Sequence, residues 1–598
     1  MKHFAAAALP LLLVAVPAWP QTAPPSAAVE AQARRYRFDL ARNFFPSLAA
    51  EAQARAALVR DASALAQAAA RIDSAAALLR ALEAEDEIRH RFRRHDLYHF
   101  LRYAVNIREE QGLREAAGLR AAIVAARRSV REAVLALPPE RLAAFVREVP
   151  GLSRFLFYVE TLRLDARLAL RPEQEAVVAA LEPLAGGSDY PRIVEALQFE
   201  EIDAGGRRLH ARRDQNLIAA DPSEDIRSDG VRQLFAGYAQ QRELLAFVLG
   251  RTVLAADALA RLRGFSDAVD QAAFERRIDP ASPAHMVASV RARAGDYRSW
   301  QRRVRNPETV PLRWLPDEAV RLIIASAGAL GPVYRGEFAA LLDPANGRAD
   351  IAAGPNRLPI AGTASVYPTG ASAIFLGSFD GVLLDLIVLA HEGGHAVQAQ
   401  LMHRAGVPMA YAAGPGYLTE SFGRFQELLL LDHLRRTARG QAERRMFRDA
   451  LAWRLYAVFP TAEEAAVELA LHRAVRAGAR SADALDSATA EAGAPFSIEY
   501  ERAPQRRGLW MLSEGYFMAP LHEIDDLYAS LLAVRYFRMW RRDPAGFRER
   551  YLRLLSGGYD AGPRTLLRRS LGLDFGDRDF ADETMEMLRQ EVTALYRD

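Results

Sequence analysis

The sequence predicts a mainly α protein with a small β element beside one central helix. Residues 31–185 are rich in Ala, Leu, Arg and Glu, contain few Gly or Pro, and repeat apolar residues at three- and four-residue spacing. The same spacing returns from about residue 222 to the C-terminus, interrupted by an irregular Gly-, Pro- and Asn-rich stretch at 343–370. The β-prone residues 371–379 end at an Asp-Gly turn, and a long apolar helix follows directly.

The 598 residues are too many for one core, so we expect two or more packed subdomains. Residues 1–18 carry one lysine, a short apolar run and a small-residue exit, which predicts a signal peptide and a soluble exported protein, periplasmic or secreted. Residues 19–30 read as a disordered lead-in. The first linker signal is Gly-Gly-Ser-Asp at 186–189, which separates an N-terminal helical domain, 31–190, from a second domain, 191–598.

The second domain opens with a predicted hairpin. Residues 199–202 and 207–212 flank the turn sequence Asp-Ala-Gly-Gly, and a capping signature at 221–225 then starts the first helix. Further helices are predicted at 284–303, 316–342, 420–437, 440–478, 481–492, 522–542, 544–555 and 579–596.

Composition excludes several kinds of chemistry. The chain has no cysteine, and its one lysine is Lys2, so thiolate metal sites, disulfides, P-loop lysines and Schiff bases are excluded from the mature protein. The formal net charge of +3 gives no case for nucleic-acid binding. Beyond the N-terminal run, no apolar stretch is long enough to span a membrane.

The motif His391-Glu-Gly-Gly-His395 falls inside a predicted helix. An HExxH sequence places two imidazoles one turn apart on one face with a carboxylate beside them, which suits two zinc ligands and a general base, Glu392. Zinc needs a third protein ligand, and Glu420 is the candidate. The alternative is a pair of histidines that cap or pack within a helical core. The β-prone stretch before the motif is either a wall for an extended peptide or a core strand.

Two further acids are candidates for supporting the histidines. Glu427 lies two turns beyond Glu420 and precedes four leucines, so its neighbourhood is expected to be buried, and a ligand imidazole is a natural partner for it. Asp385 lies six residues before the first motif histidine, with helix capping as its alternative role. His95 and His99 also lie four apart, but Asp96 follows the first of them, which favours a surface or capping role over a second metal site.

These segments resemble a known family. The stretch from Asp385 through His391-Glu-Gly-Gly-His395 to Glu420-Ser-Phe-Gly-Arg-Phe-Gln-Glu427 is similar to the M3 metallopeptidases, within the thimet oligopeptidase superfamily, and looks most like the oligoendopeptidase F branch. Segments at 221–227, 262–265, 374–381 and 551–563 resemble that family in its order, so the likeness covers roughly 196–595.

The resemblance implies an M3-like gluzincin fold with two helical halves around a deep substrate channel, with residues 31–190 forming much of one wall. It implies one zinc ion per chain on His391, His395 and Glu420. A late histidine and tyrosine, matched here by His522 and Tyr528, would bind substrate and stabilise the transition state.

The implied function is an exported zinc metalloendopeptidase that hydrolyses oligopeptides, and a monomer is expected. The alternatives are a dipeptidyl carboxypeptidase or carboxypeptidase of a related helical gluzincin family, and a non-catalytic peptide-binding protein on this scaffold.

The sequence also departs from the family pattern. Gly393 stands where a large apolar residue is usual, so either the helix is locally looser or something else packs there. Ser530 and Leu532 stand where tyrosines are common, and Tyr516 or Tyr536 are candidates to compensate.

Overall fold

The computed structural model describes residues 27–181, 187–215, 218, 221, 223–304 and 312–597. The predicted signal peptide and residues 19–26 of the lead-in lie outside this range. Residues 27–30, also assigned to the lead-in, instead belong to helix α1 (Ala27–Ala33), whose Val29 and Ala33 are buried in the largest core. The lead-in therefore ends earlier than predicted.

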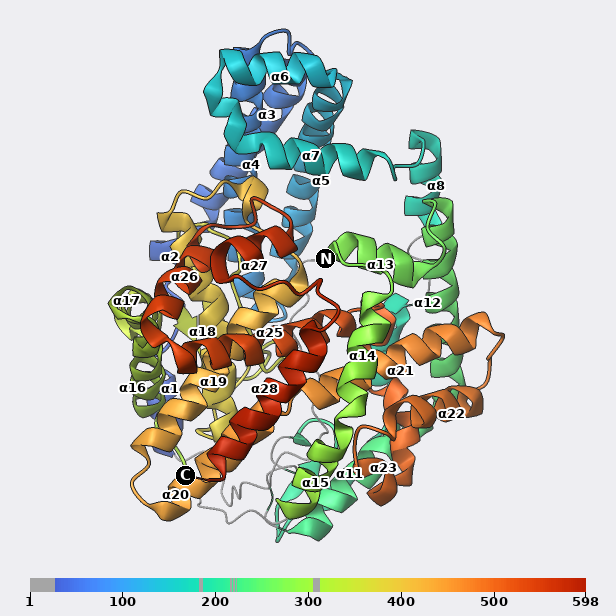
Figure 1. The fold of residues 1–598 in the computed structure, drawn as a ribbon. Helices are drawn as coiled ribbons and strands as arrows, with labels where there is room; N and C mark the ends of the chain where they lie inside the picture. The colour runs from blue at the N-terminus through green and yellow to red at the C-terminus, as the bar shows by residue number, and fades with distance from the viewer. Residues whose placement is uncertain are drawn as a thin grey trace.

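Helices form almost all of the regular structure, which confirms the predicted fold class (Figure 1). The N-terminal helices α3 to α7 project at one end, drawn from blue to cyan, and enclose a core of their own around Leu58, Leu78, Val130 and Phe155. Ser47 and Ser74 cap α3 and α4 through their hydroxyl groups. The N-terminal helices are α2 (Leu40–Asn43), α3 (Leu48–Ala69), α4 (Ala75–Val105), α5 (Glu110–Ala136), α6 (Pro139–Glu148), α7 (Leu156–Ala166), α8 (Pro172–Leu181) and α9 (Tyr190–Glu195).

The rest of the chain forms two groups of helices, which lie on the left and the right of Figure 1. The right-hand group contains α11 (Glu224–Ala239), α12 (Arg242–Leu262), α13 (Ala268–Arg276), α14 (Ser282–Ala292), α15 (Ala294–Arg303), α21 (Val458–Arg476), α22 (Ala482–Gly493), α23 (Glu499–Arg502) and α24 (Glu514–Met518). The left-hand group contains α16 (Pro316–Ala327), α17 (Pro332–Leu342), α18 (Leu383–Arg404), α19 (Gly416–Thr437), α20 (Gln441–Leu455), α25 (Glu523–Arg542), α26 (Pro544–Ser556), α27 (Pro563–Leu571) and α28 (Phe580–Leu595).

Short 3-10 helices join several of these elements: η1 (Pro150–Phe155), η3 (Gly187–Asp189), η4 (Gly328–Leu330), η5 (Pro344–Asn346), η6 (Met409–Tyr411) and η7 (Pro504–Met511). The hairpin and the helix cap that the sequence predicted after residue 190 are both present. Strands β1 (Glu201–Asp203) and β2 (Arg208–His210) form an antiparallel hairpin, and Ser223 caps α11 by accepting from the Ile226 amide (3.4 Å).

A three-stranded sheet lies against the helix that carries the motif. Its order is β3-β5-β4, where β3 (Ala349–Asp350) runs parallel to β5 (Ile374–Leu376) and β4 (Gly362–Ala364) runs antiparallel to it. The predicted β-prone stretch is therefore the central strand, and all three of its residues are buried. The edge strand β4 packs closely on α18, since a Cβ added at Gly362 would lie 3.0 Å from Cγ of Glu392.

Glycines allow α18 to pack closely on both sides. A Cβ added at Gly393 would lie 2.3 Å from Cε1 of Phe338 on α17, so the phenylalanine ring occupies the space of the missing side chain. On the other side, a Cβ added at Gly394 would lie 3.3 Å from the Cα of Gly423 on α19. Helix α18 runs without a break from Leu383 to Arg404, so the second of the two alternatives for Gly393 is correct: the helix is not looser, and an aromatic ring packs there.

The expectation for His95 and His99 is wrong. Both side chains are buried, and each lies 2.9 Å from the same carboxylate oxygen of Glu51, which also accepts from Arg55 Nε (3.1 Å). Phe45 stacks on His95, so this group forms a closed polar cluster between α3 and α4. No pattern in the sequence indicates that Glu51, 44 residues before His95, lies against the pair.

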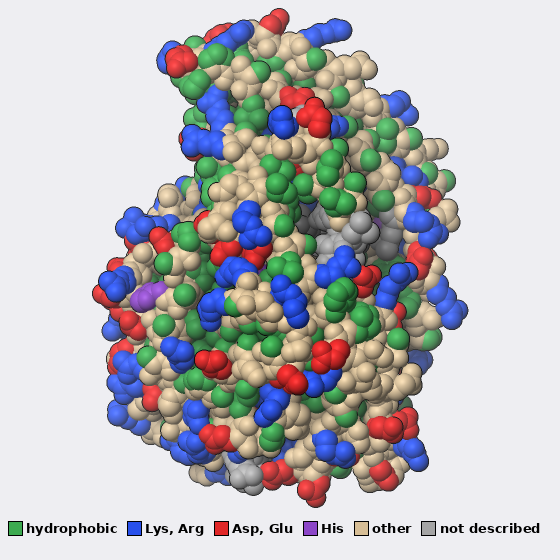
Figure 2. All heavy atoms as spheres, turned by 90° about the vertical axis from the view of Figure 1, so that its right-hand side faces the viewer, with side chains coloured by type: hydrophobic (Ala, Val, Ile, Leu, Met, Phe, Trp, Pro, Cys, Tyr) green, Lys and Arg blue, Asp and Glu red, His purple; other side chains and the backbone are tan. Residues whose placement is uncertain are grey.

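Charged side chains of both signs are interspersed over the face shown in Figure 2. Within the described part of the chain, no helix is both long and apolar enough to cross a membrane.

Replacing Gly393 by alanine tests the packing of α17 on α18. The helix propensity of alanine favours the variant by about 1 kcal/mol, but the overlap with Phe338 is expected to cost more, so that the free energy of unfolding falls by about 1 kcal/mol overall. Gly250→Ala in α12 is the matched control, because no atom lies within 4 Å of its added Cβ; this control should stabilise the protein in denaturant titrations.

The double variant Gly393→Ala/Phe338→Leu should recover part of the loss, because the smaller side chain makes room for the methyl group. Equal stability of the Gly393 and Gly250 variants would contradict the packing argument.

Candidate metal centre

Three of the predicted ligands converge at one point. The two Nε2 atoms of His391 and His395 lie 3.0 Å apart. The carboxylate of Glu420 on α19 reaches them, with one oxygen 3.3 Å from the first nitrogen and the other 3.7 Å from the second. The predicted HExxH pair and its third partner are therefore brought together, 25 residues apart in sequence.

The orientation of the His391 imidazole is fixed by contacts at Nδ1, the ring nitrogen that does not face the other candidate ligands. Its Nδ1 lies 2.6 Å from Oε1 of the fully buried Glu427, which also accepts from Arg454 Nη2 (2.6 Å). A Cβ added at Gly423 would lie 2.7 Å from the imidazole, so α19 contacts the ring directly. The predicted supporting role of Glu427 agrees with this geometry. Asp385 has the alternative role, because its Oδ2 accepts from the amides of Asp380 (2.7 Å) and Val382 (3.0 Å) and caps α18.

The donor set fits a divalent cation. Because Nδ1 of His391 donates to Glu427, Nε2 of this ring carries a free lone pair. This nitrogen lies close to Nε2 of His395 and to the carboxylate of Glu420, so the three groups can share one cation. Burial lowers the pKa of His395 to about 4, which keeps this imidazole neutral and able to coordinate. Two neutral imidazoles and one carboxylate are a donor set that zinc accepts, with further positions left open.

The carboxyl group of Glu392 lies beside the candidate ligands and is not held by a hydrogen bond from the described residues. The side chain is buried, and Oε1 has no hydrogen-bond partner among the described residues. Burial raises the pKa of Glu392 to about 7. A carboxyl group near neutral pKa in this position is suited to exchanging a proton with a reacting group.

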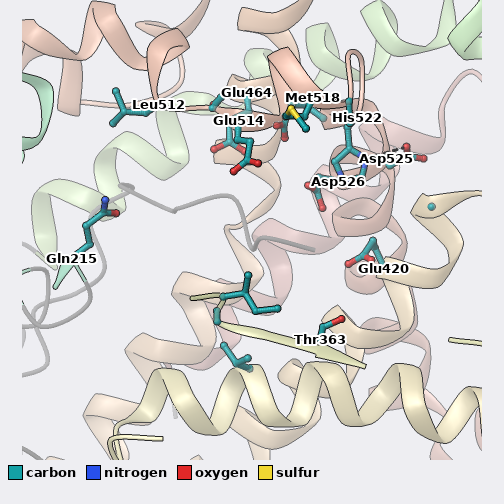
Figure 3. Close-up of a pocket in the computed structure, with 18 of the residues that line it drawn as sticks. Gln215, Thr363, Glu420, Glu464, Leu512, Glu514, Met518, His522, Asp525 and Asp526 are labelled. Atoms are coloured by element: carbon teal, nitrogen blue, oxygen red, sulfur yellow. Dashed lines mark ion pairs between the residues drawn. The ribbon is translucent and has the colours of Figure 1, made fainter. Parts of the chain in front are cut away.

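Glu420, one of the three candidate ligands, lines a large cavity between the two groups of helices. Its volume is about 2120 Å³, and its walls include Val388 and Glu420 on one side and Tyr238, Arg276 and Leu512 on the other. Figure 3 shows Glu420 and Thr363 on one side of this pocket, facing a group of acidic side chains. Of the described residues in 31–190, only Arg93, Leu97 and Tyr190 line the cavity. The expectation that this N-terminal domain forms much of one wall is therefore wrong.

His522 faces this cavity, as the sequence predicted for a residue that contacts substrate. Burial alone would lower its pKa, but the hydrogen bond to Asp525 and the charges of Asp526 and Glu523 outweigh burial and raise the pKa of His522 to about 10. The imidazole is therefore a charged donor at neutral pH.

Tyr528 does not reach the cavity. The residue is buried, its hydroxyl contacts Ser282 on α14, and it is absent from the lining of the pocket. The position of its side chain therefore contradicts the predicted catalytic role, because six residues, about one and two-thirds turns of α25, place it on a different face of the helix from His522. Tyr516 and Tyr536 are also buried away from the cavity wall.

The sequence reasoning missed Tyr559, which lines the cavity beside the candidate ligand Glu420. Its hydroxyl accepts from Gln398 Nε2 (2.9 Å) and lies 2.9 Å from the hydroxyl of Thr419. Gln398 follows the second motif histidine by three residues, and Thr419 precedes Glu420. The hydroxyl of Tyr559 thus lies between the two helices that supply the candidate ligands. One feature of the sequence could have identified Tyr559: it lies in the Gly-Gly-Tyr segment that resembles the family.

Buried carboxyl groups are concentrated on the cavity side of α21 and α25. Burial and neighbouring negative charge raise the pKa of Glu464 and Glu523, and burial raises that of Glu468. Each has one buried carboxylate oxygen without a hydrogen-bond partner among the described residues. These groups therefore lower the stability of the fold when they ionise.

Glu523→Gln tests this electrostatic cost. In the native protein the pKa of Glu523 is raised, so the folded state holds more protons than the unfolded state and loses stability as pH rises from about 4.5 through the raised value. Glutamine removes this loss, so the melting temperature of the variant should exceed that of the wild type by roughly 1 °C or more at pH 8, and by less at pH 5. A difference in melting temperature that does not depend on pH would mean that the negative charge of the Glu523 carboxylate is compensated within the folded protein.

No protein-family model and no curated protein matches the sequence. Solved structures do match. A protein of Chlamydophila abortus assigned to the peptidases has a TM-score of 0.70 and 19% identity, over 88% of this chain and 91% of that one. The oligoendopeptidase-F of Enterococcus faecium has a TM-score of 0.62 and 16% identity, over 92% and 99%. PZ peptidase A, solved with an inhibitor, has a TM-score of 0.69 and 15% identity, over 90% and 97%. The chain thus has the fold of the oligoendopeptidase F structures, as the sequence resemblance predicted.

Proposed function

We propose that this chain is an exported zinc-dependent metalloendopeptidase that hydrolyses oligopeptides. The observation that carries the proposal is the convergence of His391, His395 and Glu420 beside the unpartnered carboxyl group of Glu392, at the wall of a cavity of about 2120 Å³. The likeness in fold to solved peptidases supports the same reaction class. The export part of the proposal depends on residues 1–18 alone.

The three converging side chains would hold one zinc ion per chain, and a bound zinc ion supplies Lewis acidity and lowers the pKa of water. Glu392 accepts a proton from the attacking water and delivers it to the leaving amine. Its burial keeps this carboxyl group close to neutral pKa, so that both transfers are accessible near pH 7. Glu427 holds His391 in one orientation throughout.

Two side chains of the same cavity provide donors for the substrate. His522 is a charged donor on the wall formed by α25, and Tyr559 offers a hydroxyl next to the ligand helices. Donors fixed in place before the reaction stabilise the negative charge that develops on a peptide carbonyl oxygen.

The edge strand β4 is suited to aligning an extended peptide. It pairs only with β5, so the backbone groups of its other edge face away from the sheet, and Thr363 and Ala364 line the cavity. A peptide that added to this edge would run past Glu392, because Gly362 lies against its side chain. Internal cleavage is expected, and peptides blocked at both ends test it, since a carboxypeptidase would not cut them.

Glu392→Gln is the direct test of the mechanism. The variant should bind one zinc ion per chain, as measured by elemental analysis, because the ligands are untouched. Its kcat on a quenched oligopeptide should fall at least about 100-fold, because the proton acceptor is gone. Removal of the metal by a chelator should abolish wild-type activity, and added zinc should restore it. Retained activity in the variant would overturn the proposed role of Glu392.

Tyr559→Phe and Tyr528→Phe form a matched pair. Loss of the hydroxyl of Tyr559 should lower kcat by about 10-fold or more, because a donor beside the reacting carbonyl is removed. Loss of the hydroxyl of Tyr528 should leave kcat close to that of the wild type, because this group contacts Ser282 outside the cavity. The reverse order of effects would restore Tyr528 as the catalytic tyrosine.

A further inference from the structure

One wall of the cavity carries more negative than positive side chains. Helices α21 and α25 contribute four carboxyl groups to the lining, and two cationic side chains line the cavity beside them. The acids are Glu464, Glu523, Asp525 and Asp526, and the cations are Arg276 and His522. Glu468 and Arg424 are buried next to them without lining the cavity.

The cations are already engaged with the two aspartates. Arg276 Nη2 donates to Asp525 (2.6 Å), and the imidazole of His522 lies 3.7 Å from the same carboxylate. Arg424 donates to Asp526. Each aspartate therefore has a charged partner from the protein itself.

Glu464 and Glu523 have no such partner. Their exposed fractions are 6% and 4%, and within the described part of the chain neither side chain forms an ion pair or a hydrogen bond. Burial raises the pKa of both groups, the negative charge of Glu523 adds to the effect on Glu464, and that of Asp526 contributes to both. A buried carboxylate without a partner is costly, so its retention at a binding wall points to a partner that arrives with a ligand.

Both side chains lie where a ligand can reach them. They line the cavity, and Figure 3 shows Glu464 with the exposed Glu514 at the same end of the pocket as His522 and Asp526. Arg424, which binds Asp526, follows the candidate zinc ligand Glu420 by one helical turn, a rise of about 6 Å. The acidic wall thus begins close to the proposed reaction centre.

We propose that Glu464 and Glu523 form a subsite for a positively charged group of the peptide substrate, so that the enzyme prefers cationic oligopeptides. This inference rests on the proposed peptidase function. The group is a guanidinium or ammonium ion, from a basic side chain or from the amino terminus of the peptide. A planar guanidinium can bridge two neighbouring carboxylates through parallel hydrogen bonds, which makes arginine the best fit.

The test compares peptides that differ by one charge. A set of quenched peptides carries arginine or its neutral isostere citrulline at one position at a time, each with a free or an acetylated amino terminus. For at least one position, or for the free terminus, kcat/KM should be about 10-fold or more higher for the charged form. The arginine arm and the acetylation arm identify which source supplies the cation.

Glu464→Gln and Glu523→Gln should each reduce this ratio towards one, mainly by raising KM for the charged peptide more than KM for the citrulline peptide. Glu463→Gln is the matched control. Glu463 is the neighbour of Glu464 on α21 and equally buried, but it binds Arg506 and does not line the cavity, so its variant should keep the wild-type ratio. Thermal melting verifies that each variant is folded.

Binding separates this inference from the proposed function. Fluorescence anisotropy of the same peptides on Glu392→Gln measures charge preference without turnover. If this variant binds charged peptides preferentially and the wild-type protein hydrolyses none of the peptides, the result would support the subsite and reject the peptidase. Hydrolysis of charged and neutral peptides at equal rates, with equal binding, would overturn the subsite and mean that the two glutamates share a proton in the native protein.

Discussion

The candidate centre depends on the close contact between helices α18 and α19. Gly394 and Gly423 allow the two backbones to approach, so that the imidazole of His391 rests on α19 while Glu420 and Glu427 reach it from the same helix, two turns apart. Phe338 presses α18 from the opposite side, against Gly393. A side chain at Gly423 would overlap the imidazole of His391, and one at Gly393 would overlap the ring of Phe338, so residues with no side chain determine where those with functional side chains can meet.

Local spacing was enough to predict much of this centre. The i, i+4 histidines occupy one face of one helix and the two glutamates seven residues apart occupy one face of another, and helical geometry predicts each of these two pairs. Predictions failed where the answer depended on a neighbouring element. Tyr528 enters the core because of how α25 packs, Asp385 caps its own helix, and His95 and His99 meet Glu51 from a different helix. Tyr559 and Phe338 approach α18 from distant segments, which no periodicity in the sequence encodes.

The cavity wall formed by α21 and α25 illustrates a conflict between stability and binding. Buried carboxyl groups without partners reduce the free energy of unfolding at neutral pH, yet they present strong acceptors at the place where a substrate would lie. Arg276, Arg424 and His522 neutralise only the aspartates. The distribution of charge, rather than the fold, is therefore what would distinguish this chain from others with the same arrangement of helices.

The contact of Gly423 with His391 also affects how the centre would acquire an ion. The ring is held between α19 and the buried Glu427–Arg454 pair, so its rotamer is selected by packing and not by coordination. Binding of an ion would then order few additional torsions, at a small entropic cost. Loading and loss of the ion would be local events, uncoupled from the folding of the helices, in contrast to small zinc domains whose structure forms only with the metal.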